Sequence, residues 1–150
     1  MDIIFTFFFL KKIEFFYHII KEEMNCDKKC HEILKYVGQK LIEATKEGDA
    51  EKVQELLNIG INPNFQDKYG MTALMLASIN GHLDTVRLLL ENKADVNFQD
   101  KYGKTALMHA SYRGHSDIVC ILCGNKADVN FQDKYGKTAL MWASGSGHSE

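Results

Sequence analysis

The stretch NFQDKYGMTALMLAS at residues 64–78 recurs as NFQDKYGKTALMHAS at residues 97–111 and as NFQDKYGKTALMWAS at residues 130–144. Each copy begins 33 residues after the one before it. A fixed period of this length indicates stacked repeats, in which each unit packs on its neighbours. The repeat therefore determines the fold of this part of the chain, and candidate functional residues have to be judged against it.

Each copy opens with a turn and the start of a helix. Asp67 and Gly70 hold the first and fourth positions of Asp-Lys-Tyr-Gly, which is the preference of a type I turn and predicts a hairpin tip. Thr72 precedes an apolar run, where its hydroxyl can accept a hydrogen bond from the first helical turn. Leu74 and Ala77 then lie on one face of the predicted helix.

The second half of each copy predicts a longer helix. Gly81 interrupts the first helix, and Leu83, Val86 and Leu89 then follow at helical spacing. A unit of one tip, one short helix and one longer helix has too little core to be stable alone, so stacking of copies must bury the shared face. The sequence therefore predicts an all-α repeat solenoid.

The pattern D-x-x-G-x-T-A-L-M-x-A-S-x-x-G-H, followed by x-L-L-x-x-x-A-D-V-N, resembles the signature of ankyrin repeat proteins. The resemblance extends from about Leu41 to Glu150 and implies a β-hairpin tip and an antiparallel helix pair in each 33-residue unit. It implies an ankyrin repeat domain over residues 40–150, made of a capping unit (40–66), two repeats (67–99 and 100–132) and a partial repeat (133–150), behind an N-terminal apolar and charged segment (1–39).

The chain departs from the family pattern in two places. The family's T-P-L-H is T-A-L-M here, and loss of the proline predicts a softer start of the first helix. Lys93 and Lys126 stand where the family often has glycine after the second helix, and a positive φ is uncommon for other residues. The neighbouring Asn92 and Asn125 could take the left-handed conformation instead.

Charge and cysteine content restrict the class of protein. The formal net charge of −2 argues against nucleic acid as a partner, because phosphate binding requires a basic excess. The four cysteines form two close pairs in sequence, not a disulfide framework, which favours a reducing compartment and a cytoplasmic protein. Cys120 and Cys123 lie inside a predicted second helix. Cys123 replaces Leu90 and is expected to be buried, with Cys120 more exposed.

We expect neither a metal nor another cofactor. Cys26, Cys30 and His31 offer three possible zinc ligands, whereas a structural zinc site requires four at suitable spacing. His82, His115 and His148 follow the glycine between the two helices in every copy, where the resemblance implies a structural role. A catalytic residue would rarely be needed three times at one repeat position, and no nucleophile, base and acid converge. We therefore expect no enzyme.

The two ends of the chain leave alternatives open. The apolar stretch at residues 3–10 is shorter than the roughly 20 residues of a membrane-spanning helix. Residues 1–23 could form an extra helix on the stack, a membrane-surface anchor (residues 3–20), or translated upstream sequence before a biological start at Met24. The sequence stops where a second helix should begin, so we expect a fragmentary array; the alternative is an open apolar end that needs a partner. We expect a monomer unless that end associates.

The tips and first helices are the candidate partner-binding surface. Their repeated Lys-Tyr pairs predict a basic, aromatic strip that suits an acidic or phosphorylated surface on a partner protein, unless the pairs are only a soluble turn copied by duplication. Positions 71, 76, 79 and 80 differ between copies at sites that ankyrin proteins use on the concave face, which fits either partner specificity or surface drift. Tryptophan, tyrosine and arginine are common binding hot spots. The predicted binding residues are Lys68, Tyr69, Met71, Leu76, Ile79, Asn80, Lys101, Tyr102, Lys104, His109, Tyr112, Arg113, Lys134, Tyr135, Lys137 and Trp142.

These features together predict a non-catalytic protein–protein interaction module that binds through the concave face of a repeat stack. The alternative function is a fragment of a larger multidomain protein, or a membrane-attached scaffold, in which the repeats position another domain. Repeats specify a scaffold and not a target, so the sequence does not name the partner.

Overall fold

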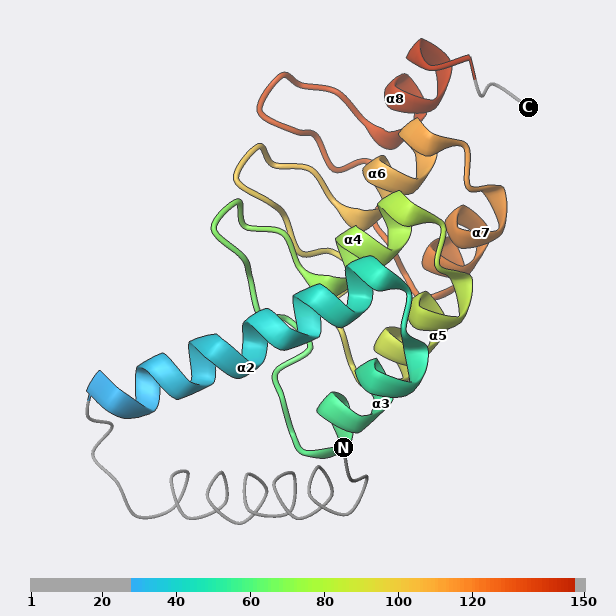
Figure 1. Ribbon diagram of the computed structural model, residues 1–150. Coiled ribbons are helices and arrows are strands. Elements are labelled where there is room, and N and C mark those ends of the chain that lie inside the picture. The colour runs from blue at the N-terminus through green and yellow to red at the C-terminus, as the bar shows by residue number, and fades with distance from the viewer. Residues whose placement is uncertain (1–27, 148–150) are drawn as a thin grey trace.

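The computed structural model describes residues 28–147 as a stack of helix pairs with loops projecting from one side (Figure 1). The helices of this part of the chain are α2 (Lys28–Glu47), α3 (Ala50–Asn58), α4 (Ala73–Asn80), α5 (Leu83–Glu91), α6 (Ala106–Arg113), α7 (Ser116–Gly124) and α8 (Ala139–Gly145). The first helices α2, α4, α6 and α8 form one column, and the second helices α3, α5 and α7 form the other. The predicted all-α solenoid is confirmed.

The first helices α4, α6 and α8 begin where the sequence predicts, whereas α2 begins at Lys28, ahead of the predicted capping unit. The Thr72 hydroxyl accepts a hydrogen bond from the Met75 N–H at 3.4 Å, and Thr105 and Thr138 cap α6 and α8 in the same way. Gly81 ends α4 in the left-handed conformation at φ 76°. A Cβ at Gly81 would lie 2.9 Å from the His115 ring, so a larger residue would be both strained and crowded.

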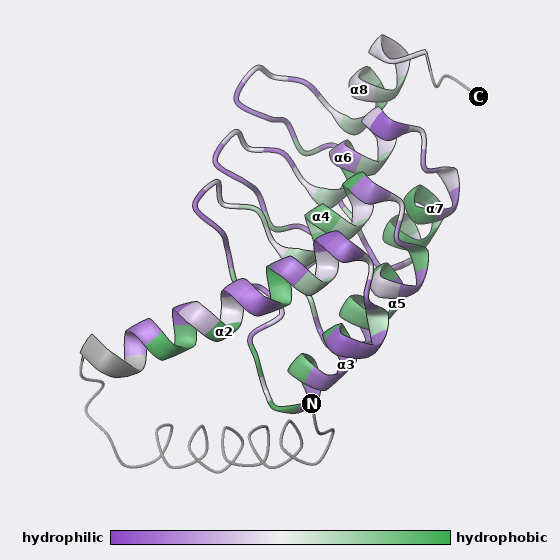
Figure 2. Ribbon diagram, in the orientation of Figure 1, coloured by the Kyte–Doolittle hydropathy of each residue, from purple (hydrophilic) through white to green (hydrophobic). Residues whose placement is uncertain are grey.

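The core lies between the two columns. Helix α4 is buried from Ala73 to Ser78 because α2 and α6 flank it and α5 covers it. A helix that is apolar all round is expected at such a position. Hydropathy follows the same division: the projecting loops are largely hydrophilic, whereas α7 is mostly hydrophobic (Figure 2).

The projecting loops are tight turns without β-strands in the described residues. We call residues 67–71, 100–104 and 133–137 the three tips. The Asp67 N–H donates to the Met71 carbonyl at 3.0 Å, which closes the first tip. Adjacent tips are joined by the Lys101 N–H to the Tyr69 carbonyl (3.2 Å) and by the Lys134 N–H to the Tyr102 carbonyl (2.9 Å). The predicted hairpins are therefore hairpin-shaped turns linked in a row.

The prediction that Asn92 and Asn125 take the left-handed conformation is wrong. Lys93 and Lys126 take positive φ values of 66° and 67°, whereas Asn92 and Asn125 have φ values of −89° and −97°. Each asparagine instead uses its side-chain amide to cap its own helix, as Asn92 Nδ2 does by donating to the Leu88 carbonyl at 2.9 Å. The left-handed position therefore falls on the residue after the cap, which is the usual arrangement at a helix C-terminus.

The expected burial of Cys123 is also wrong, because both Cys120 and Cys123 are exposed. In the preceding copy Leu90 is half-buried on α5, beside which α7 packs. The described residues contain no further second helix beyond α7, so Cys123 has no comparable neighbour.

Some predictions concern residues outside the described range. These are the alternatives for residues 1–23, including the anchor at residues 3–20 and a start at Met24, and the roles of Cys26 and His148. The domain boundary between residues 39 and 40 stays a prediction, and α2 runs across it without a break. None of the helices between residues 28 and 147 combines the length and apolar character needed to cross a membrane.

Candidate functional site

An aspartate organises each of the three tips. One carboxylate oxygen of Asp100 (Oδ1) accepts hydrogen bonds from the backbone N–H groups of Tyr102 at 2.8 Å and Lys104 at 2.9 Å. Asp67 and Asp133 hold their tips in the same way. This geometry fits an aspartate at this position in every copy, since its short side chain places one oxygen within reach of both N–H groups.

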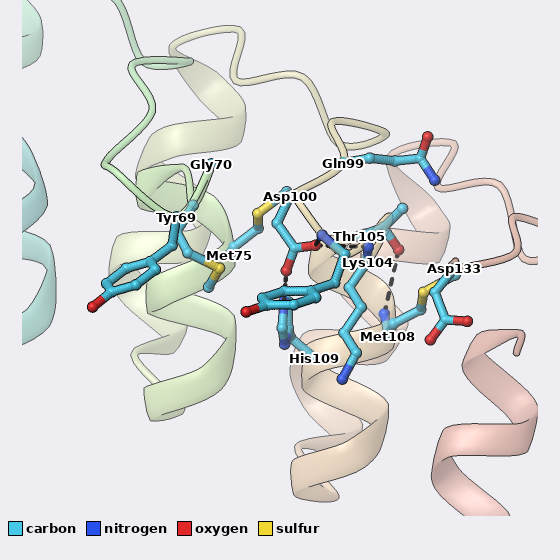
Figure 3. A network of polar contacts seen from close by, with 12 residues as sticks. Tyr69, Gly70, Met75, Gln99, Asp100, Lys104, Thr105, Met108, His109 and Asp133 are labelled. Carbon is cyan, nitrogen blue, oxygen red and sulfur yellow. Dashed lines mark hydrogen bonds and ion pairs between the residues drawn. The ribbon is translucent and has the colours of Figure 1, made fainter. Parts of the chain in front are cut away.

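The other oxygen connects the second and third tips to their first helices. Figure 3 shows the contact between Asp100 and His109. Asp100 Oδ2 lies 3.0 Å from His109 Nε2, and Asp133 Oδ2 accepts a hydrogen bond of 3.0 Å from Trp142 Nε1. Leu76 occupies the equivalent position of the first copy and has no N–H to donate from its side chain. Two of the three tips are thus tied to the helix that follows them.

The environment of these two carboxyl groups favours their charged form. Burial raises the pKa of Asp100, but hydrogen bonds from His109 and from the backbone of Lys104 and Tyr102 outweigh it, so its pKa lies below the ordinary value. Burial likewise raises the pKa of Asp133. The backbone N–H groups of its tip, the Trp142 ring and the charge of Lys104 lower that pKa below the ordinary value. Both aspartates are therefore charged carboxylates, and both oxygens of each accept hydrogen bonds from within the protein.

Trp142 is the centre of a cluster of aromatic and basic side chains. The Tyr112 ring meets it edge to face, with centroids 5.6 Å apart and an interplanar angle of 89°. Lys104 Nζ lies 3.7 Å and Lys137 Nζ 4.6 Å from the centroid of the Trp142 ring. Such contacts are attractive because the cation faces the negative side of the ring system. We call Lys104, Tyr112, Lys137 and Trp142 the tryptophan cluster.

The predicted binding residues lie at different depths of this side of the stack. Ten are exposed: Lys68, Tyr69, Asn80, Lys101, Tyr102, Tyr112, Arg113, Lys134, Tyr135 and Lys137. Met71, Ile79, Lys104, His109 and Trp142 are half-buried. Leu76 is only 9% exposed and packs in the core, so it offers a partner very little surface.

The structure brings together residues that the sequence presents separately. Lys104 of the second tip and Lys137 of the third tip meet on one tryptophan, although they are 33 positions apart. The roles of Asp100 and Asp133 in holding His109 and Trp142 were missed, because the sequence pattern assigns these aspartates only to a turn. The one signal was a ring N–H nine positions after each aspartate, and only the fold shows that this distance is bridged.

His82 and His115 have the structural role that the resemblance implies. His82 Nε2 lies 3.3 Å from the Lys46 carbonyl, and His115 Nε2 lies 3.1 Å from the Ile79 carbonyl. Each histidine thus bonds the end of the first helix in the preceding unit. These contacts join neighbouring units, so both rings take part in holding the stack together.

Two further features of the described residues concern metal binding and catalysis. In the described part of the chain, no three His, Cys, Asp or Glu side chains gather closely enough to hold a metal ion. An open groove of about 670 Å³ lies between the N-terminal half of α2 and residues 61–68, with Leu34, Phe65 and Lys68 among its lining residues. Its other lining includes one histidine and one aspartate without a shared hydrogen bond, so it presents no assembled catalytic group.

The comparison with protein families gives the same result as the repeat geometry. A family model described as ankyrin repeats, with 3 copies, matches residues 41–133. The chain belongs to the ankyrin repeat family. No curated protein matches it in a sequence comparison. Ankyrin repeats are generally protein–protein interaction modules without catalytic activity of their own.

Proposed function

We propose that this protein is a non-catalytic interaction module that binds a partner protein through the side formed by the three tips and by α4, α6 and α8. We call this side the tip-and-first-helix face. Repeat solenoids bind through an extended concave surface, and we assign that role to this face. The observation that carries the proposal is the concentration of exposed aromatic and basic side chains on this one side.

The aromatic content is unusual for a surface that contacts only water. Tyr69 and Tyr102 are each 53% exposed, Tyr112 is 48% exposed and Tyr135 is 71% exposed. The chain has 6 tyrosines and 1 tryptophan, and this face carries four of those tyrosines together with Trp142. Tyrosine, tryptophan and arginine are enriched at protein interfaces and among their energetic hot spots.

Sequence variation between the copies supports this face less strongly. Ten positions differ between residues 64–96 and residues 97–129, and six of them lie in the second helices α5 and α7. Variation by itself therefore does not distinguish the two sides of the stack. The tryptophan cluster does, because it combines a large aromatic group with cations held in a defined geometry.

The test compares two double variants of the full chain as baits in lysate from its source cells. Tyr112→Ala with Arg113→Ala removes two exposed side chains from α6. Arg87→Ala with Glu91→Ala removes two exposed side chains from α5 and serves as the matched control. Circular dichroism reports whether each variant keeps its helix content.

We expect the α6 variant to bind the partner recovered by the unmodified chain at least ~10-fold more weakly, since hot-spot truncations cost about 1–2 kcal/mol or more. The α5 control is expected to bind normally. If the folded α6 variant binds with unchanged affinity, or if the α5 control loses as much affinity, the partner does not bind through the tip-and-first-helix face.

A further inference from the structure

The lysines of the tips carry positive charge that the tip aspartates do not neutralise by ion pairing. Within residues 28–147 the ion pairs are Lys40 with Glu43 and His109 with Asp100. The face nevertheless contains six cationic side chains, namely Lys68, Lys101, Lys104, Arg113, Lys134 and Lys137. A chain with a formal net charge of −2 thus presents a locally basic side.

The aspartates next to these lysines are occupied elsewhere. Asp100 is 7% exposed and Asp133 is 6% exposed, and both carboxylate oxygens of each accept hydrogen bonds within the protein. The first tip has one lysine and one aspartate, whereas the second and third tips each have two lysines and one aspartate, so the positive charge is greatest at the second and third tips. Carboxylates that are buried and bonded leave the exposed ammonium groups available to an acidic ligand.

Two of these ammonium groups are also held in place. Lys104 and Lys137 lie over the Trp142 ring, and the Tyr112 ring packs at right angles to it. A long side chain held against a ring has lost part of its rotamer freedom before any ligand arrives. Binding then costs less side-chain entropy than it would with two freely moving lysines.

The tips repeat at a distance that suits an extended peptide. The Lys101 N–H bonds the Tyr69 carbonyl, which places these two backbones about 5 Å apart. The residue of the second tip that is equivalent to Tyr69 is Tyr102, which directly follows Lys101. The Cα atoms of Lys101 and Tyr102 are therefore about 3.8 Å apart. These two steps limit the spacing of Tyr69 and Tyr102 to about 9 Å, and packed helices lie about 8–10 Å apart, so equivalent tip residues recur at about 9 Å. An extended chain covers about 10 Å in three residues, about 7 Å in two and about 13 Å in four.

We propose that the tip-and-first-helix face binds an extended acidic segment of the partner, in which a carboxylate recurs at every third residue. Successive carboxylates then meet the lysines of successive tips, and the tyrosine rings contact the residues between them. This inference rests on the proposed function and adds the chemical class and the register of the ligand.

The experiment uses three fluorescent peptides of the same length and composition with the full chain. Three glutamates stand at every third position in the first peptide, at every second position in the next, and in one block in the last. Fluorescence anisotropy gives the dissociation constants at about 50 mM and about 150 mM salt, since contacts between exposed charges weaken with ionic strength. We expect the first peptide to bind about 5-fold or more tightly than the others, with weaker binding at the higher salt.

A pair of matched variants locates the contact. Lys101→Gln with Lys134→Gln removes the same charge from two consecutive tips, and we expect it to abolish the preference for the first peptide. Lys93→Gln with Lys126→Gln also removes one exposed lysine from each of two consecutive units, but at the ends of α5 and α7. This control is expected to retain the preference.

Equal affinity for the three peptides would overturn the register. An equal effect of the two lysine variants would overturn the placement on the tips, and tighter binding of a peptide with a single phosphoserine would overturn the carboxylate ligand. None of these results contradicts the proposed function. That proposal fails separately if the variant Tyr112→Ala with Arg113→Ala binds the partner with unchanged affinity.

Discussion

Asp100 shows how much one side chain contributes to the site, because it bonds the tip through one oxygen and His109 through the other. Its pKa is lowered in the folded protein. The charged form therefore stabilises the fold, fully above the unfolded-state pKa of about 3.9, and this contribution is lost as the pH falls through the lower folded-state pKa.

We expect Asp100→Asn to lower the free energy of unfolding at pH 7 by about 1.5–3 kcal/mol, the range for hydrogen bonds to a charged group. Urea denaturation between pH 7 and pH 3 measures this loss. The difference between the variant and the unmodified chain should shrink below about pH 4, where the aspartate of the unfolded chain becomes protonated while that of the folded chain is still charged. Glu91→Gln, at an exposed position of α5, is the control. Parallel pH profiles for the Asp100 variant and the unmodified chain would contradict this account.

Residue-level prediction from the sequence succeeded where the cause is local. The cap by Thr72 and the turn at Asp67 depend on neighbours within four positions, and both are found. The exposure of Cys123 and the partner of Asp133 depend on which helices lie nearby in space. A sequence window contains no such information, so the first was predicted wrongly and the second was missed.

At the scale of the element, the ends of the second helices store backbone strain. Lys93 adopts the left-handed conformation after α5, although a side chain makes it unfavourable by about 1–2 kcal/mol. Glycine would relieve this strain, but it would also increase the entropy of the unfolded chain. The two effects have opposite signs, and the relief of strain is the larger.

We therefore expect Lys93→Gly to raise the free energy of unfolding by about 0.5–1 kcal/mol. Asn92→Gly is the informative counterpart, because it removes the bond from Asn92 Nδ2 to the Leu88 carbonyl at a position with negative φ. It should lower the free energy of unfolding by about 1 kcal/mol. Thermal denaturation of both variants checks the order, and the reverse order would show that Asn92 is the left-handed residue in solution.

For the whole molecule, the repeat made the architecture predictable, since a 33-residue period leaves few ways to bury the shared apolar face. The same periodicity hides how an equivalent residue differs from one unit to the next. Leu107 on α6 is 2% exposed, whereas Leu140, which occupies the same position on α8, is 74% exposed. The reason is that α4 and α8 flank α6, while α8 has its main packing contact with α6 in the described part of the chain.

This difference predicts unequal costs for the same substitution. Leu107→Ala should lower the free energy of unfolding by about 2–5 kcal/mol, because it removes buried methyl groups and leaves a cavity between three first helices. Leu140→Ala should change it by no more than about 0.5 kcal/mol, as expected for an exposed position. Urea denaturation of the two full-length variants provides the comparison. A large cost at Leu140 would mean that the outer face of α8 is covered in solution.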